Sequence, residues 1–130
     1  MGPATAADQN AENVHLRELK REILEISDES ILQARAFGSI NVSISANSNK
    51  AARKDLSLSA GESVTIDCSY SPVTASVDFG LVAPDGYFYY ERVTGGSIDK
   101  TITVDEYGSY TFVIRNNSSD TVQVIGTIKY

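Results

Sequence analysis

Apolar and polar residues alternate along most of the chain after residue 37. In the first run, Ile40, Val42 and Ile44 alternate with Asn41 and Ser43. A period of two is typical of β-strands that bury one face and leave the other in water. The same period continues in further runs, whose apolar members are Leu56 and Leu58; Val64, Ile66, Cys68 and Tyr70; Val77, Phe79 and Leu81; Ile98, Ile102 and Val104; Tyr110, Phe112 and Ile114; and Val122, Val124 and Ile128.

Turn-forming residues separate these runs. The strongest turn signal is Pro84-Asp85-Gly86, because proline fixes φ and glycine accepts positive φ. We expect positive φ at Gly86 and at Gly108. Strands every 8–12 residues, with turns between them and no helices, predict an all-β fold. About eight antiparallel strands over residues 37–130 are the pattern of a β-sandwich or a barrel.

The part of the chain before residue 37 follows a helical period. Its apolar residues are spaced by three and four, as on one face of a helix: Leu16, Leu19, Ile23 and Ile26. A second short helix is expected over residues 28–36, with Ile31 and Leu32 buried. The apolar face has two interpretations. It packs on its own domain or forms part of a linker, or it contacts a partner, which includes self-association with a second copy of this chain.

The chain is therefore expected to divide into three parts. Residues 1–10 are interpreted as disordered or as an added, non-native end. Residues 11–36 are a helical segment or linker, and residues 37–130 are the β-sandwich domain. The first ten residues lack the basic and apolar regions of a signal peptide. No run in the sequence approaches the roughly 20 apolar residues that span a bilayer, so no transmembrane segment is predicted.

Composition excludes several classes of function. The 130 residues carry a net charge of −6, divided equally between residues 1–36 and 37–130. That balance argues against a nucleic-acid partner, which needs clustered Lys and Arg. One Cys and one His exclude an internal disulfide and a multi-histidine metal centre. No dinucleotide, phosphate-loop, serine-hydrolase or zinc-protease motif is present, so we expect no enzymatic activity.

The remaining candidate groups have structural interpretations. His15 is expected on the surface of the predicted helix, and Cys68 is expected in the core because it shares the parity of Val64 and Ile66. Six carboxylates lie in or near predicted turns, where Ca²⁺ often takes its oxygen ligands: Asp78, Asp85, Asp99, Asp105, Glu106 and Asp120. No calcium-loop spacing connects them. Calcium is the one cofactor considered, with solvated turn residues as the alternative.

The run Tyr87-Phe88-Tyr89-Tyr90 is the most unusual local feature. On a strand, Tyr87 and Tyr89 face one way, and Phe88 and Tyr90 face the other. We expect one pair to be at least partly exposed. Exposed tyrosines suit stacking on sugar rings or contact with a protein, so Tyr87, Tyr89 and Tyr90 are the candidate ligand-binding residues. The alternative is aromatic packing beneath a neighbouring segment.

Several stretches of residues 56–130 resemble one family. They are residues 58–66 (LSAGESVTI), 78–86 (DFGLVAPDG) and 107–114 (YGSYTFVI), and they are similar to the bacterial pre-peptidase C-terminal domain. Residues 68–72 (CSYSP) and 115–119 (RNNSS) also resemble the C-terminal ectodomains of membrane metallopeptidase sensors in gut Firmicutes. The resemblance implies an antiparallel, jelly-roll-like β-sandwich over residues 37–130. It also implies that this domain is secreted or on the cell surface, is appended to an enzyme or receptor, and has no catalytic residue of its own.

Function follows as an expectation from these features. The first hypothesis is a non-catalytic accessory module of a bacterial surface or secreted protein, which mediates binding or spacing outside the cell. The second is a carbohydrate-binding module that uses the tyrosine run to bind a polysaccharide. The third is an assembly domain joined through the N-terminal helix. A surface protein or a polysaccharide is the expected partner.

Overall fold

The computed structural model describes residues 12–27 and 37–130, and most of their regular structure is β. The elements in chain order are β1 (Glu12–His15), the short 3-10 turn η2 (Leu16–Glu18), β2 (Lys20–Ile23), β3 (Phe37–Ile44), β4 (Asn49–Ala51), β5 (Leu56–Leu58), β6 (Ser63–Ser71), β7 (Val77–Val82), β8 (Tyr87–Val93), β9 (Ser97–Thr103), β10 (Gly108–Asn116) and β11 (Val122–Lys129). Within these two ranges, no helix is long and apolar enough to cross a membrane.

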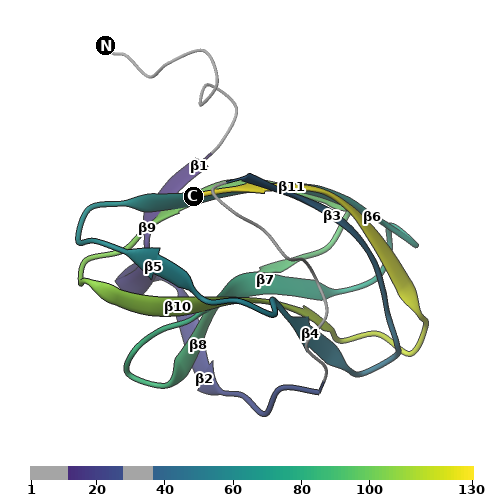
Figure 1. The fold of residues 1–130 in the computed structure, drawn as a ribbon. Helices are drawn as coiled ribbons and strands as arrows, with labels where there is room; N and C mark the ends of the chain where they lie inside the picture. Colours follow the sequence, from purple (N-terminus) through teal and green to yellow (C-terminus); the bar gives the residue numbers. More distant parts are fainter. Residues whose placement is uncertain (1–11, 28–36) are drawn as a thin grey trace.

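Two β-sheets lie face to face (Figure 1). One sheet has the strand order β1-β9-β6-β11-β3, and the other has the order β2-β8-β7-β10-β4, with β5 also paired to β10. The pairings are antiparallel except for β1 and β9, which run parallel. The predicted all-β sandwich is confirmed, and its jelly-roll connectivity stays a prediction.

The core between the sheets is built from the alternating positions. In β6, Val64, Ile66 and Cys68 are buried, whereas Asp67 and Ser69 face outward. Cys68 is 2% exposed, as the parity predicted. The larger side chains that are fully buried come from both sheets: Phe79, Leu81, Phe112, Ile114, Ile44, Ile66, Ile102 and Ile128. Removing this apolar surface from water is the main term that stabilises the sandwich.

The predicted N-terminal helix is wrong. Glu12–His15 forms β1 on the edge of β9, and Lys20–Ile23 forms β2 on the edge of β8. The edge of a sheet carries unpaired N–H and C=O groups that another strand can satisfy, whereas a short isolated helix is marginal in water. Pairing with the sheets therefore overrides the local helical spacing. The second predicted helix, over residues 28–36, lies outside the described residues.

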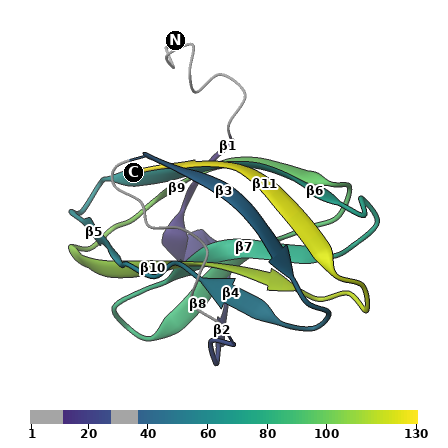
Figure 2. The ribbon, with the colours of Figure 1, turned by 45° about the vertical axis from the view of Figure 1, so that its right-hand side comes forward.

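The four residues of the predicted helical face separate in space. Leu16 is 7% exposed and packs into the core, and Leu19 is partly buried against the same core. Ile23 is 72% exposed and Ile26 is 38% exposed. Figure 2 shows the chain descending from β1 in one sheet, through η2, to β2 in the other. The β1-η2-β2 segment therefore closes one open side of the sandwich, with Leu16 inserted between the layers.

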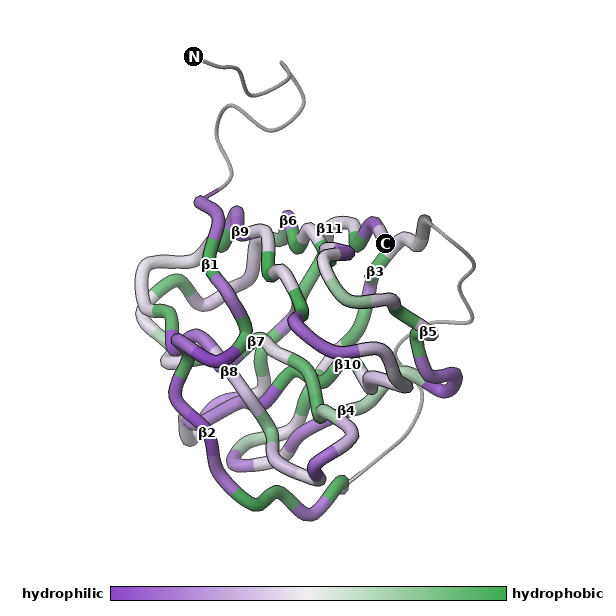
Figure 3. Tube along the Cα trace, turned by 90° about the vertical axis from the view of Figure 1, so that its left-hand side faces the viewer, coloured by the Kyte–Doolittle hydropathy of each residue, from purple (hydrophilic) through white to green (hydrophobic). Residues whose placement is uncertain are grey.

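Residues 24–27 then cross the outer face of the second sheet. Leu24 packs against a cluster of Ala51, Phe88, Tyr90 and Val113. At the far edge, the Ser27 amide donates to Asn49 Oδ1 at 2.9 Å, and Asn49 Nδ2 donates to the Glu25 carbonyl at 3.0 Å. Figure 3 shows the hydrophilic β2, which forms the opposite edge of this sheet, followed along the chain by more hydrophobic positions. The central strands of this sheet are consequently buried on both faces.

Candidate functional site

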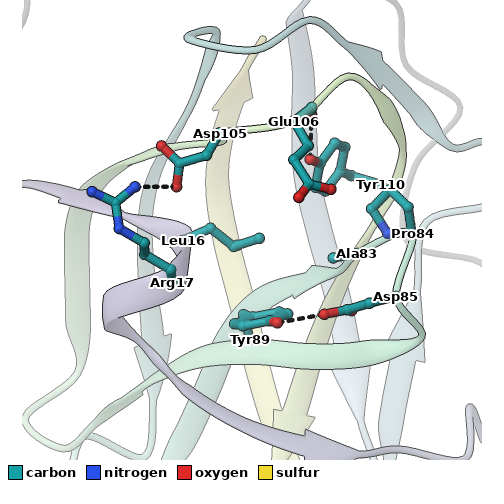
Figure 4. A pocket seen from close by; sticks show the side chains of 9 residues that line it. All are labelled: Leu16, Arg17, Ala83, Pro84, Asp85, Tyr89, Asp105, Glu106 and Tyr110. Carbon is teal, nitrogen blue, oxygen red and sulfur yellow. Dashed lines mark hydrogen bonds and ion pairs between the residues drawn. The ribbon is translucent and has the colours of Figure 1, made fainter.

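One pocket opens at the end of the sandwich where three loops meet (Figure 4). Its volume is about 160 Å³. The β1-η2-β2 segment, the β7–β8 turn and the β9–β10 loop surround it. We call it the end pocket and define it by the residues that line it: Leu16, Arg17, Ala83, Pro84, Asp85, Tyr89, Asp105, Glu106 and Tyr110.

The β7–β8 turn forms one wall of the end pocket. Gly86 has φ +90°, as predicted, and its amide donates to the Ala83 carbonyl at 2.9 Å. The Asp85 carboxylate accepts from the Tyr87 amide at 3.0 Å and from the Tyr89 hydroxyl at 2.5 Å. This hydrogen bond raises the pKa of Tyr89, since ionisation would place two negative charges side by side. Asp85 is thus fixed in orientation at the pocket wall.

Gly108 differs from its prediction. It lies outside the positive-φ region, whereas Gly61, Gly86, Gly95, Gly96 and Gly126 lie within it. A Cβ at Gly108 would lie only 2.4 Å from Pro84 Cγ. The glycine therefore allows the β9–β10 loop to approach the β7–β8 turn closely, and this approach forms one corner of the end pocket.

An ion pair holds the third wall. Arg17 Nη1 lies 2.6 Å from Asp105 Oδ2, and His15 Nδ1 lies 3.0 Å from Asp105 Oδ1. The hydrogen bond from Arg17 lowers the pKa of Asp105, with a smaller contribution from His15. His15 ends β1 rather than lying on a helix, and it is bound to a carboxylate that Arg17 also neutralises. It therefore helps to attach the N-terminal segment to the β9–β10 loop.

Glu106 and Tyr110 complete the pocket. The Tyr110 hydroxyl donates to the Glu106 backbone carbonyl at 2.5 Å, and burial raises the pKa of that tyrosine. Figure 4 shows the Glu106 carboxylate turned into the pocket. Among residues 12–27 and 37–130, no hydrogen bond or ion pair engages that carboxylate. Glu106 is therefore the group in the end pocket that the fold itself does not use.

The predicted tyrosine site does not form one exposed face. Tyr89 is 8% exposed and lines the end pocket, while Tyr90 is 4% exposed and lies on the opposite face of β8. Tyr90 stacks on Phe88, with ring centroids 5.1 Å apart, and donates to Glu22 at 2.5 Å. Tyr87 is half-buried, with the Arg21 guanidinium 4.7 Å from its ring centroid. Glu22 of β2 and Leu24 contact the side chains on this outer face of β8, so the face is not open to solvent. A ligand-binding role for the three tyrosines stays a prediction.

A buried ionic network was missed by the sequence analysis. Asp78 was expected on a wet face near a turn, but it lies in β7 and is fully buried. Arg92 Nε donates to Asp78 Oδ1 at 2.9 Å, and Arg115 Nε donates to Asp78 Oδ2 at 2.8 Å. Arg115 also pairs with Glu22 of β2 at 2.9 Å. This correction removes Asp78 from the calcium candidates, because two guanidiniums already occupy its oxygens.

The other acidic candidates do not converge. Within the part of the chain that the structure describes, no group of three or more His, Cys, Asp or Glu side chains is arranged to hold a metal ion. Asp99 faces Asp67 across β9 and β6. Burial raises the pKa of Asp99, and the Asp67 charge raises it further. Calcium binding stays a prediction without a located site.

Comparison with known proteins shows a likeness of fold alone. No protein-family model matches the chain, and no curated protein sequence matches it. Among solved structures, the chain is similar to PliG of Aeromonas hydrophila, described as a periplasmic lysozyme inhibitor of g-type lysozyme. The TM-score is 0.57 at 13% identity, and the match covers 79% of this chain and 98% of PliG. The similarity in fold thus extends over nearly the whole of the neighbour's chain.

Proposed function

We propose that this chain is a non-catalytic binding module that acts outside the cytoplasm, with a protein as its partner. The observation that carries this proposal is the likeness to PliG, which is a protein inhibitor and shares this architecture over 98% of its length. Fold likeness at 13% identity does not transfer a partner. The likeness supports only a class of function, which is binding to another protein, because PliG is described as an inhibitor of a lysozyme.

The chemistry of the described residues supports a non-catalytic role. Cys68 is buried, and burial raises the pKa of its thiol to about 12, so it is not an activated nucleophile. His15 is held by Asp105, with no nucleophile among its hydrogen-bond partners. In the end pocket, Asp85, Asp105 and Tyr110 make hydrogen bonds that fix the surrounding loops. These groups therefore have a structural role in the loops around the pocket rather than a catalytic one.

The resemblance to pre-peptidase C-terminal domains indicates the kind of protein in which such a module would occur. We propose that it is an accessory domain with a jelly-roll-like arrangement, appended to a bacterial secreted or surface protein. The support is the set of stretches 58–66, 78–86 and 107–114, which the structure places around the β5–β6 connection, along β7 and its turn, and along β10. Two of these stretches contribute residues to the end pocket.

The alternative functions have less support. Polysaccharide binding by the tyrosine run lacks a platform, because Tyr89 and Tyr90 are 8% and 4% exposed and their hydroxyls are bonded to carboxylates. Assembly through the predicted N-terminal helix is not supported, because the described part of that segment forms β1, η2 and β2. Leu16, its first predicted contact residue, is part of the core.

Direct binding measurements test the proposal. The purified chain is titrated calorimetrically with a g-type lysozyme, with the extracytoplasmic proteins encoded beside it, and with soluble polysaccharides. We expect saturable one-to-one binding to a protein and no turnover of the partner. Binding to polysaccharide alone, or hydrolysis of any of these molecules by the chain, would contradict the proposal.

A further inference from the structure

We propose that the end pocket receives one basic side chain, a lysine or an arginine, from the protein partner. This inference rests on the proposed function, because it assumes that the partner is a protein. It adds the position of the contact and the chemistry of the residue that is recognised. Three features of the pocket carry it: its size, the combination of apolar walls with a free carboxylate, and its balance of charge.

The size of the pocket fits a side chain better than a free ligand. Its volume is about 160 Å³, whereas pockets for metabolite-sized or drug-sized ligands hold roughly 300–1,000 Å³. A cavity of about 150 Å³ accepts a benzene-sized group. The end pocket therefore has room for the outer part of one long side chain. A sugar chain or a nucleotide would extend beyond it.

The walls match the two parts of a basic side chain. Leu16, Ala83 and Pro84 supply apolar surface, and the rings of Tyr89 and Tyr110 also line the pocket. Lysine and arginine bury their methylene stems along such surface while the charged end stays with polar groups. The Glu106 carboxylate, turned inward in Figure 4, lies where that charged end would be bound. Its engagement would cost no existing contact among the described residues.

The charge of the pocket selects a cation. Three carboxylates line it, and Arg17 is the one basic residue among its lining groups. Arg17 is already paired with Asp105 at 2.6 Å. Asp85 accepts hydrogen bonds from Tyr87 and Tyr89, and the charge of the nearby Arg21 guanidinium acts on it. Glu106 is therefore the carboxylate of the pocket that has no cationic partner among the described residues. The bonds to Asp85 also hold it in place before a partner arrives, which limits the ordering cost of binding.

The test uses single-residue probes with the full chain. Nα-acetyl-lysine methylamide, the arginine analogue and the neutral norleucine analogue are titrated while amide shifts are followed by ¹H–¹⁵N NMR. We expect both basic probes to shift the amides of Leu16, Asp85, Glu106 and Tyr110 at millimolar concentration. The norleucine probe, which keeps a four-carbon stem without the ammonium, should not. The tighter of the two basic probes identifies the preferred side chain.

A matched pair of variants separates charge from folding. Glu106→Gln removes the free carboxylate and no contact of the fold, so it should weaken the basic probes about fivefold, as loss of one exposed ion pair does. Glu25→Gln makes the same change outside the pocket, at a side chain with no hydrogen bond or ion pair among the described residues, and should leave binding unchanged. Equal shifts by norleucine, absence of shifts by both basic probes, or undiminished binding by Glu106→Gln would each overturn the inference.

The same variants distinguish this inference from the proposed function. A protein that binds the wild type and Glu106→Gln equally well supports the binding module and removes the end pocket from its interface. Retained selectivity for the basic probes without binding to any protein contradicts the proposed function, while the cation preference of the pocket stands. Weaker binding of the partner by Glu106→Gln, with Glu25→Gln unchanged, supports both.

Discussion

Arg115 on β10 and Arg92 on β8 stand directly opposite Asp78 on β7, one on each side of it in the strand register. Arg115 Nη2 lies 2.7 Å from Asp78 Oδ2, and Arg92 Nε lies 2.9 Å from Asp78 Oδ1. The Asp78 side chain is fully buried, whereas the Arg92 and Arg115 side chains are 42% and 15% exposed. The buried Asp78 carboxylate therefore links β7 to β8 and β10. Arg115 extends this network to Glu22 in the N-terminal segment.

Removing that anion should strongly destabilise the fold. Asp78→Asn leaves two guanidiniums without their shared counter-charge, and breaking a buried pair from one side typically costs about 3–5 kcal/mol. Urea unfolding followed by circular dichroism measures the change. Asp120→Asn is the matched control because Asp120 is exposed, and we expect a change within about 0.5 kcal/mol. Similar midpoints for the two variants would show that the network contributes little.

Residues of the N-terminal segment should contribute unequally to the free energy of unfolding, with a large contribution from Leu16 and a small one from Ile23. Leu16→Ala empties a position in the core and should lower the free energy of unfolding by about 2–4 kcal/mol. Ile23→Ala, at a side chain that is 72% exposed, should change it by less than about 0.5 kcal/mol. Thermal and urea melts of both variants decide this. Equal losses would instead favour a continuous apolar face, as on a helix.

The Cys68 thiol should resist modification and should make stability depend on alkaline pH. Burial raises its pKa to about 12 from an ordinary value of 9.0. The neutral thiol is therefore favoured in the folded state. That contribution is fully present below pH 9 and is lost as the pH rises toward 12, by up to about 1.4 kcal/mol per pH unit.

Two measurements check the behaviour of Cys68. An aromatic disulfide reagent at pH 8 should label the thiol only in denaturant. The free energy of unfolding of the wild type should fall more steeply between pH 9 and 11 than that of Cys68→Ala, which lacks the titrating group. Rapid labelling of the native protein, or parallel pH profiles, would contradict the burial of this side chain.

Substitution by alanine should destabilise the fold at both Gly80 and Gly86, and more strongly at Gly80. A Cβ at Gly80 would lie 1.9 Å from the Tyr89 carbonyl oxygen, so Gly80→Ala forces β7 and β8 apart and should cost more than about 3 kcal/mol. At Gly86 the space is open, but φ is +90°, and the backbone strain of an alanine there is about 1–2 kcal/mol. Soluble yield and melting temperature should rank wild type above Gly86→Ala and Gly86→Ala above Gly80→Ala. The reverse order would contradict the close contact.

The sequence predicted those parts of the fold that depend on the burial of one strand face. Alternation located β6 and β10, and turn residues located the β7–β8 turn with Gly86. It failed where a distant segment changes the burial. Asp78 and Tyr90 lie on the outer face of their sheet. Arg92 and Arg115 enclose Asp78, and Glu22 and Leu24 cover Tyr90. Nothing in the local pattern of β7 or β8 encodes that cover.

The candidate site was predictable to a similar extent. Pro84 and Asp85 were identified from their turn signal, and Tyr89 was selected as an unusual aromatic residue. Their meeting with Arg17 and Glu106 depends on the β1-η2-β2 segment, for which the helical interpretation was wrong. The Arg17–Asp105 pair joins residues far apart in the sequence, and pairs of this kind leave no periodic signal.

The division of β1 and β2 between two sheets affects where the chain can be shortened. A fragment beginning at Phe37 would lack one edge strand from each sheet and would present the edges of β9 and β8 to solvent. Lys100 would lose its contact with Glu12 at 3.0 Å, and the core would open where Leu16 now fills it. Free sheet edges recruit strands from other molecules. We therefore expect a fragment that begins at Phe37 to self-associate more readily than the full chain, which sedimentation of the two would measure.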